Sequence, residues 1–252
     1  MSITATIQAR MGSSRLPGKV LIDICGKPML QWQVERISKS RLIDNIIVCT
    51  SIAQIDDDIQ EFCDKNNIQC FRGSENDVLE RISSALKENK IKTHVECHGD
   101  SPLIDPLIID DFIDFFLKNS KNFDYVSSAL KTTYPPGLEV TVYKAEILIK
   151  INKLIKANDP MREHVGYNLT RFPEKFRLKS LEAPPEFFAP EIYLEVDTIE
   201  DLKLITKIIK KFTNDGKKFF STGEILNLIK QNPQLTKINN SIKRNWKSLR
   251  EI

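Results

Sequence analysis

Apolar and polar positions divide the first half of the chain into strand-like and helix-like segments that alternate. Residues 3–9 alternate apolar with polar side chains, as in a half-buried strand, whereas residues 46–50 form the continuous apolar run of a central parallel strand. Residues 29–37 repeat apolar side chains at helical spacing. The same patterns predict helices over 55–66, 76–88 and 106–118, and strands over 69–72, 91–98 and 124–129. This order predicts an α/β fold with a Rossmann-like, mainly parallel sheet, helices on both faces, and ligands at the carboxyl ends of the strands.

The pattern is less regular in the second half of the chain. It predicts strands over 138–143, 176–181 and 192–196, helices over 145–157, 161–171, 199–212 and 223–231, and a proline-rich surface loop over 183–190. We therefore expect an α/β domain over residues 1–212. Within it, residues 133–190 form a smaller mixed extension for acceptor binding or dimerisation. A helical, basic tail over 213–252 is expected to pack on this domain.

The strand at 3–9 runs into a loop that combines cations, hydroxyls and glycines. The loop contains Arg10, Gly12, Ser13, Ser14, Arg15, Gly18 and Lys19. Glycines let backbone N–H groups approach anionic oxygens, and Arg and Lys neutralise their charge, so this loop suits a polyphosphate. It is not a Walker loop, because five residues separate Gly12 from Gly18. It is not a dinucleotide fingerprint either, because G-x-G-x-x-G is missing. An exposed basic turn is the alternative interpretation.

Two aspartates follow apolar runs and are therefore expected at the same sheet edge as this loop. Asp100 comes directly after Gly99, and Asp197 follows the predicted strand at 192–196. Carboxylates in this place can hold Mg²⁺, which usually takes one or two of them together with phosphate oxygens. Asp100 lies too early to cap the helix at 106, a role that suits Asp105. Asp197 can instead cap the helix at 199, and Glu195 is a weaker metal candidate.

The loop sequence resembles the nucleotide-binding signature of the cytidylyltransferases, A-R-x-x-S-x-R-L-P-G-K. It is matched by Ala9, Arg10, Ser13, Arg15, Leu16, Pro17, Gly18 and Lys19. That superfamily makes CMP-activated acidic sugars, such as CMP-sialic acid and CMP-ketodeoxyoctonate. QARMGSSRLPGKVL most resembles its spore-coat polysaccharide, SpsF-like branch. GDSPL and VDTIEDL resemble its metal-binding elements, so the resemblance implies a nucleotidyltransferase fold of the GT-A-like kind, CTP as co-substrate, and Mg²⁺ on Asp100 and Asp197.

The resemblance also implies roles for individual residues. The catalytic residues would be Arg10, Arg15, Lys19 and Asp100. The nucleotide would be bound by Ala9, Arg10, Met11, Gly12, Ser13, Ser14, Arg15, Lys19, Ser74, Asp77 and Gly99. The acceptor would be bound by Tyr134, Gly137, Glu139, Arg162, Glu163 and His164, which lie in segments similar to the spore-coat branch. Ser74 and Asp77 fit a helix cap equally well, and a lone histidine such as His164 is more often structural.

The implied reaction is attack of an acceptor oxygen on the α-phosphorus of CTP, with release of pyrophosphate. An acidic sugar or related anionic acceptor would give a CMP- or CDP-activated product for surface polysaccharide or glycan biosynthesis. A nucleotide-sugar-dependent glycosyltransferase is the alternative enzyme, although its usual D-x-D motif is missing, since Ser101 and Pro102 follow Asp100. A catalytically silent nucleotide-binding protein is the alternative of a different class.

Composition indicates which classes of binding partner and which cellular compartment to expect. The chain of 252 residues is 41% hydrophobic and 28% charged, as in ordinary globular proteins, and its net charge of +3 gives no reason to expect nucleic-acid binding. Five cysteines without metal-ligand spacing fit a reducing cytoplasm. No apolar run reaches the roughly 18 residues that would indicate a membrane span. We expect a cytoplasmic homodimer, as the related synthetases generally are. The basic tail suits a solvated helical face or an acidic partner.

Overall fold

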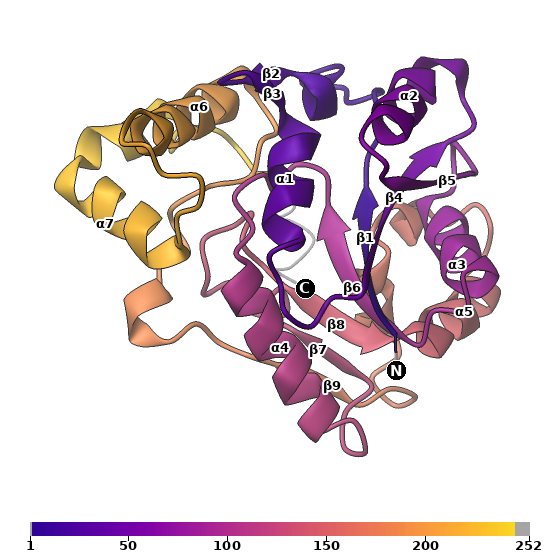
Figure 1. The fold of residues 1–252 in the computed structure, drawn as a ribbon. Helices are drawn as coiled ribbons and strands as arrows, with labels where there is room; N and C mark the ends of the chain where they lie inside the picture. The colour runs from indigo at the N-terminus through magenta and orange to yellow at the C-terminus, as the bar shows by residue number, and fades with distance from the viewer. Residues whose placement is uncertain (1, 245–252) are drawn as a thin grey trace.

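The computed structural model describes residues 2–244, and its centre is a seven-stranded sheet in the order β5-β4-β1-β6-β8-β7-β9 (Figure 1). The strands are β1 (Ile3–Gln8), β4 (Asn45–Ser51), β5 (Gln69–Gly73), β6 (Thr93–His98), β7 (Tyr125–Ser127), β8 (Thr141–Lys144) and β9 (Leu178–Ser180). Strands β5, β4, β1 and β6 run parallel, and β8 pairs antiparallel with both of its neighbours. The prediction of a mainly parallel α/β sheet is therefore confirmed.

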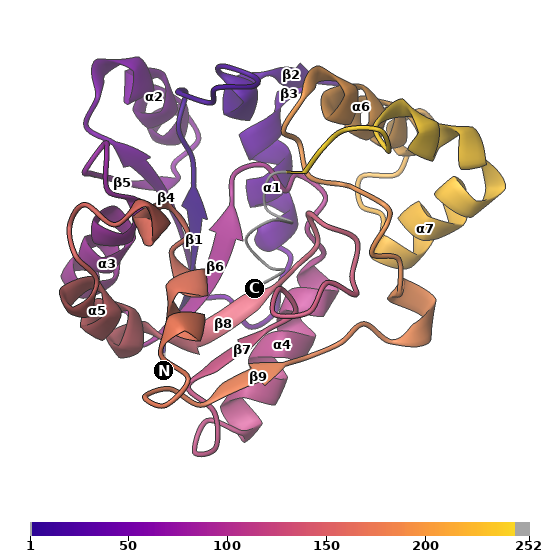
Figure 2. The same ribbon diagram turned by 180° about the vertical axis from the view of Figure 1, so that it is seen from behind.

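Helices cover both faces of this sheet (Figures 1 and 2). They are α1 (Met29–Ile37), α2 (Asp57–Lys65), α3 (Val78–Glu88), α4 (Pro106–Lys118), α5 (Ala145–Leu154), α6 (Ile199–Asn214) and α7 (Thr222–Gln231). Buried side chains of α1, α4 and α6 form one hydrophobic cluster with β1 and β6. A second cluster joins α3 and α5 to β4 and β8. The sheet thus lies between two apolar layers, and its strand ends are left free for polar chemistry.

Two predicted elements are wrong. Residues 192–196 do not form a strand, although Tyr193, Leu194 and Val196 are buried. Leu194 donates its N–H to Pro136 O, and Val196 donates to Asp100 O, so the segment bonds to two different loops instead of one strand. The helix predicted over 161–171 is replaced by two 3-10 helices, Pro160–Glu163 and Gly166–Arg171. The N–H of Gly166 donates to the side chain of Glu96, which interrupts a continuous helix. Other element ends shift by up to three residues.

Two connections outside the seven-stranded sheet have a defined geometry. The hairpin of β2 (Asp23–Ile24) and β3 (Lys27–Pro28) turns on Cys25 and Gly26, whose φ angles of 55° and 85° are both positive, as in two-residue hairpins. At the other end, the rings of Phe212 and Phe220 stack 4.2 Å apart where α6 leads to α7.

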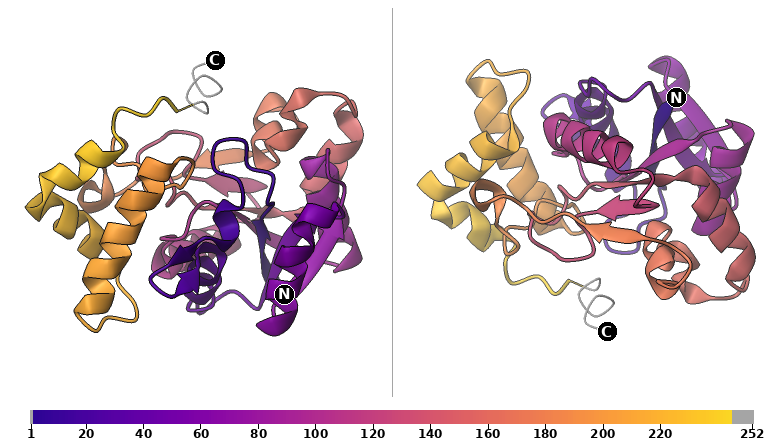
Figure 3. Two further views of the ribbon diagram at one scale, coloured as in Figure 1. Left: turned by 90° about the horizontal axis from the view of Figure 1, so that it is seen from above. Right: turned by 90° about the horizontal axis from the view of Figure 1, so that it is seen from below.

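Figure 3 shows α6 and α7 together at one side of the molecule. A 3-10 helix over Pro233–Ile238 follows α7. The predicted domain boundary at residue 212 stays a prediction. None of the helices in the described part of the chain combines the length and apolar character that crossing a membrane requires.

Candidate active site

The loop after β1 is folded back by its own backbone. Gly18 donates its N–H to Met11 O at 2.8 Å and adopts the left-handed conformation, with φ 70°. The N–H of Met11 donates to Asp56 Oδ1 at 2.7 Å. Asp56 is buried and also accepts the hydroxyl of Ser51 at 2.5 Å. These bonds fix the course of the loop. In the sequence, the aspartates at 56–58 indicate only the start of a helix, so the role of Asp56 is visible only in the structure.

Lys19 joins three segments that are distant in sequence. Its Nζ donates to Val196 O at 2.7 Å, to Asp197 Oδ1 at 3.0 Å and to Asp100 Oδ2 at 3.4 Å. Arg15 Nη2 lies 2.7 Å from the other oxygen of Asp197. Two cations of the loop after β1 thus meet one carboxylate from the end of β6 and one from the segment before α6. Four residues that the sequence singled out are brought together here.

The charges in this cluster stabilise one another. Burial of Lys19 alone would lower the pKa of its ammonium, but the carboxylates of Asp100 and Asp197 outweigh burial and raise that pKa. Burial alone would raise the pKa of Asp100, but Lys19 and His98 lower it below the usual value for an aspartate. Lys19 therefore remains a cation and Asp100 an anion at neutral pH, as a phosphate and metal site requires.

The two aspartates are the candidate metal ligands. Their carboxylates converge on one ammonium, so a divalent cation can take a position that already favours positive charge. Among residues 2–244, no group of three or more His, Cys, Asp or Glu side chains is arranged to hold a metal ion. Two carboxylates nevertheless fit Mg²⁺, which commonly completes its coordination with substrate phosphates and water.

Other predicted nucleotide-binding residues lie around this cluster. A Cβ on Gly99 would stand 2.6 Å from Gln8 O, so glycine is needed for the end of β6 to approach β1. Ala9 is buried and donates its N–H to Cys49 O. Ser13 accepts the N–H of Leu16 at 3.4 Å within the loop. Gly12 faces open space, and Ser14 is exposed, as expected of a backbone that a ligand can approach.

The region predicted to border the nucleoside contains a helix cap. Asp77 is the N-cap of α3 and accepts the N–H of Glu80, so the capping pair is Asp77–Glu80 and not Ser74–Asp77. Asp77 also pairs with Arg162 Nε at 2.7 Å. The backbone oxygen of Ser74 accepts from the buried Arg81 at 2.6 Å. A nucleoside contact by Ser74 or Asp77 stays a prediction.

Two predicted acceptor residues have structural contacts within the protein. The guanidinium of Arg162 is buried, and besides Asp77 it donates to Ile155 O and to the side chain of Asn152. It therefore holds the turn at 160–163 against α3 and α5. The ring of Tyr134 is buried between Phe112 and Phe187, with ring centroids 6.1 and 6.4 Å away.

The remaining predicted acceptor residues lie in two turns, one beside the segment that leads to Asp197 and one beside Arg10. Gly137 has φ 98°, and a Cβ there would stand 2.4 Å from Glu195 N, so this turn packs against the segment that leads to Asp197. Glu139 accepts the N–H of Gly137 at 2.6 Å. Glu163 Oε1 lies 3.7 Å from Arg10 Nη1, both side chains being about half exposed. His164 follows Glu163 directly and is partly exposed.

Sequence reasoning missed Glu96, a buried glutamate on β6. It accepts the hydroxyl of Tyr143 at 2.6 Å, the side-chain amide of Gln8 at 3.2 Å and the N–H of Gly166 at 3.3 Å. These bonds hold the turn after His164 against the sheet. A glutamate between two apolar residues, Val95 and Cys97, in the middle of a predicted strand was the signal that could have found it.

Comparison with known proteins identifies relatives that match most of the chain. A family model for cytidylyltransferases matches residues 4–240. The spore coat polysaccharide biosynthesis protein SpsF of Bacillus subtilis is 33% identical over 231 residues, 90% of this chain and 93% of its own. A 3-deoxy-manno-octulosonate cytidylyltransferase of Geobacter sulfurreducens is 34% identical over 113 residues, 45% of this chain and 44% of its own. The structure of a cytidylyltransferase from Leptospira borgpetersenii has a TM-score of 0.88 at 32% identity, covering 97% of this chain and all of that one.

Proposed function

This chain belongs to the cytidylyltransferase family, and on that basis we propose that it transfers the cytidylyl group of CTP to an oxygen of an anionic sugar acceptor. The observation that carries the proposal is the convergence of Arg15 and Lys19 on Asp100 and Asp197. Nucleotidyl transfer requires cations for a triphosphate and carboxylates for a metal at one place. This cluster supplies both at the end of β1 and β6.

Arg10, Arg15 and Lys19 are the proposed clamp for the triphosphate. Before substrate binds, Arg15 and Lys19 have carboxylate partners, so the cluster of two cations and two anions is neutral. When the triphosphate enters, these cations exchange carboxylate for phosphate oxygens, and Asp100 and Asp197 are released to hold Mg²⁺. Bound Mg²⁺ supplies positive charge at the phosphoryl oxygens and lowers the pKa of an acceptor hydroxyl.

The proposed step is an in-line displacement at the α-phosphorus. A bond forms between the acceptor oxygen and the α-phosphorus, the bond from that phosphorus to the bridging oxygen of the β-phosphate breaks, and pyrophosphate leaves. The acceptor proton passes to solvent. Such transfers depend mostly on positioning and on stabilising charge, which Arg15 and Lys19 provide from a loop of fixed course.

The acceptor is proposed to bind between two turns that border the cluster. The turn at Gly137 and Glu139 packs against the segment that leads to Asp197. The turn carrying Glu163 and His164 lies beside Arg10. Arg10 is half exposed, so it can also meet an acceptor carboxylate or phosphate. The names of the relatives support an acidic sugar as acceptor and a product for surface polysaccharide or glycan biosynthesis.

A pyrophosphate-release assay tests this function. Each of the four nucleoside triphosphates would be supplied with Mg²⁺ across a panel of acidic sugars and polyol phosphates. Release with CTP and one acceptor is expected, and it should require the divalent cation. Release with another nucleotide would overturn the choice of CTP. Binding of CTP without any release across the panel would favour a silent nucleotide-binding protein instead.

A cytoplasmic homodimer is part of the same proposal. The free cysteines of the described chain fit a reducing compartment in which CTP is made, and residues 133–190 are the proposed interface region. Sedimentation equilibrium at micromolar protein should give a mass near twice that of the 29.0 kDa chain. A single species at the mass of one chain would exclude the dimer.

A further inference from the structure

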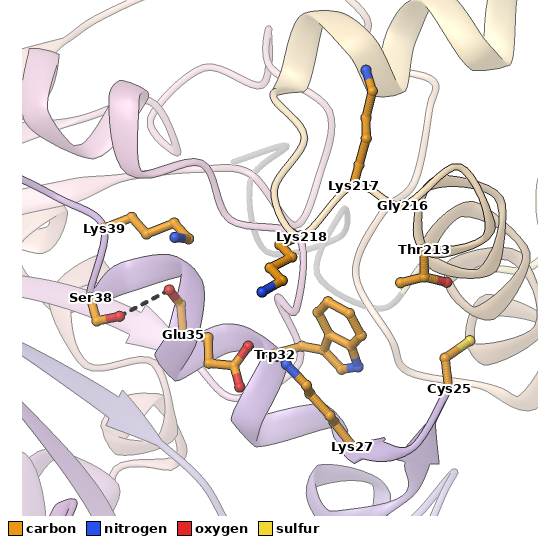
Figure 4. A pocket seen from close by; sticks show the side chains of 10 residues that line it. All are labelled: Cys25, Lys27, Trp32, Glu35, Ser38, Lys39, Thr213, Gly216, Lys217 and Lys218. Atoms are coloured by element: carbon orange, nitrogen blue, oxygen red, sulfur yellow. Dashed lines mark hydrogen bonds and ion pairs between the residues drawn. The ribbon is translucent and has the colours of Figure 1, made fainter.

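A hollow of about 630 Å³ lies between α1 and the connection from α6 to α7 (Figure 4). Its lining residues are Cys25, Lys27, Trp32, Glu35, Ser38, Lys39, Thr213, Gly216, Lys217 and Lys218. None of the candidate catalytic residues is among them. Its size falls within the range of roughly 300–1,000 Å³ that small-molecule sites occupy.

The hollow carries an excess of positive charge. Its lining has four lysines and one glutamate. Lys27 is paired with Glu35 at 2.6 Å, and Lys217 is paired with Glu224 outside the hollow. Within residues 2–244, neither Lys39 nor Lys218 has a carboxylate at ion-pair distance. Figure 4 shows the ammonium groups of Lys27, Lys39 and Lys218 directed toward the middle of the hollow, whereas that of Lys217 points away toward α7.

An aromatic ring and one carboxylate accompany these ammonium groups. The ring of Trp32 borders the hollow, with Lys27 Nζ 4.9 Å from its centroid. Its indole N–H donates to Ile24 O at 2.7 Å, which fixes the ring. The carboxylate of Glu35 offers acceptor oxygens for a ligand's hydroxyl groups. Converging cations select a phosphate, and a fixed ring beside hydroxyl acceptors suits a sugar.

We propose that this hollow is a second binding site, and that its ligand is a phosphorylated sugar. Lys39 and Lys218 bind the phosphate, Glu35 accepts from sugar hydroxyls, and the sugar ring contacts the 5% of Trp32 that is exposed. The phosphate pairs with two ammonium groups, those of Lys39 and Lys218, that have no carboxylate partner within the described residues. This inference goes beyond the proposed transfer reaction and does not depend on it.

Fluorescence of Trp32 gives a test that is independent of turnover. The chain has two tryptophans, so a Trp246→Phe background leaves Trp32 as the only reporter. Glucose 6-phosphate would be the probe, and inorganic phosphate, glucose and CTP would be separate arms. We expect a saturable change with the sugar phosphate and at least about tenfold weaker binding of inorganic phosphate and of glucose.

Matched lysine variants identify the site of binding. Lys39→Ala and Lys218→Ala should each weaken the sugar phosphate by about tenfold or more, as for loss of a charge-assisted hydrogen bond. Lys217→Ala removes the same charge from the neighbouring residue and should leave binding unchanged. The proposal is overturned if no saturable change occurs, if the three variants behave alike, or if phosphate alone or CTP binds as tightly as the sugar phosphate.

Discussion

The guanidinium of Arg244 and the carboxylate of Asp201 form a two-point ion pair in which both side chains are almost completely buried. Nη2 lies 2.7 Å from Oδ1, and Nη1 lies 3.1 Å from Oδ2. Asp201 Oδ2 also accepts the backbone N–H groups of Asp197 and Thr198, at 3.1 and 2.9 Å. The last described residue of the tail therefore stabilises the turn that presents the candidate metal ligand Asp197.

Arg244→Lys should lower kcat/KM for CTP by about tenfold or more while the protein stays folded. Lysine keeps the positive charge but cannot make the two parallel hydrogen bonds of a guanidinium, so Asp201 and the turn at Asp197 lose their fixed geometry. Steady-state kinetics at varied Mg²⁺ would measure the effect, and we expect the Mg²⁺ requirement to rise. Arg244→Ala should also unfold more easily, because it leaves Asp201 buried without its cation.

Lys243→Ala is the matched control for the tail. Lys243 is exposed and precedes Arg244 directly, so its loss should change neither turnover nor the Mg²⁺ requirement. Normal kinetics and normal Mg²⁺ dependence in Arg244→Lys would mean that the ion pair stabilises only the fold.

Lys19→Ala should reduce kcat by about two orders of magnitude or more. Removing one preorganised cation at a site of developing negative charge typically has this effect. Stopped assays of pyrophosphate release would measure it, with circular dichroism to verify folding. Lys65→Ala removes a lysine from an exposed helical pair with Glu61 and should leave the rate unchanged. Turnover near that of the unmodified protein in Lys19→Ala would reject the proposed triphosphate clamp.

The sequence predicted the central strands in two ways, because residues 3–9 alternate apolar with polar side chains and residues 46–50 form a continuous apolar run. Residues 47–50 and 93–97 are buried on both faces of the sheet. The helices between the strands were predicted from apolar side chains that repeat at 3.6 residues. The segment at 192–196 has the same apolar character but no strand beside it to pair with. Burial and strand pairing are separate requirements, and only the first is visible in the side-chain pattern.

Part of the candidate cluster was predictable because the strand ends of a parallel sheet lie at one edge. The loop that contains Lys19 follows β1 and Asp100 follows β6, whereas the segment before Asp197 is not a strand. In the sequence, Asp201 has only the pattern of an acidic residue near the start of a helix, because its partner Arg244 lies 43 residues later. A contact between two single residues that are far apart in the sequence produces no repeating pattern of side chains. The ion pair that holds the turn at Asp197 is therefore visible only in the structure.

Asp56→Ala should raise KM for CTP by about tenfold or more and lower kcat less. The carboxylate of Asp56 accepts the N–H of Met11, and without it the loop after β1 loses the contact that fixes its start. Buried donors left without a partner cost about 1–3 kcal/mol each, so the loop should rearrange. Asp58→Asn, an exposed neighbour on α2, is the control and should bind CTP normally. Equal KM values in the two variants would argue that the loop keeps its course without Asp56.

Protein stability should fall on acidification because of His94. Burial lowers the pKa of this imidazole to about 3, whereas in the unfolded chain it is near 6.5. Its Nε2 is 2.7 Å from the hydroxyl of Thr6, and its ring meets the edge of Tyr143. Between these two pKa values the unfolded chain binds a proton that the folded chain does not. The contribution of His94 is therefore complete above about pH 6.5 and is lost as the pH falls, by up to about 1.4 kcal/mol per pH unit.

His94→Gln removes this proton uptake and should flatten the acid side of the stability profile. Urea unfolding at several pH values from 7.5 to 5 would give the free energy of unfolding for the unmodified protein and the variant. The variant is expected to be less stable at pH 7.5, because the ring contact is lost, but its disadvantage should shrink toward pH 5. Parallel profiles for the unmodified protein and His94→Gln would show that His94 does not take up a proton on unfolding.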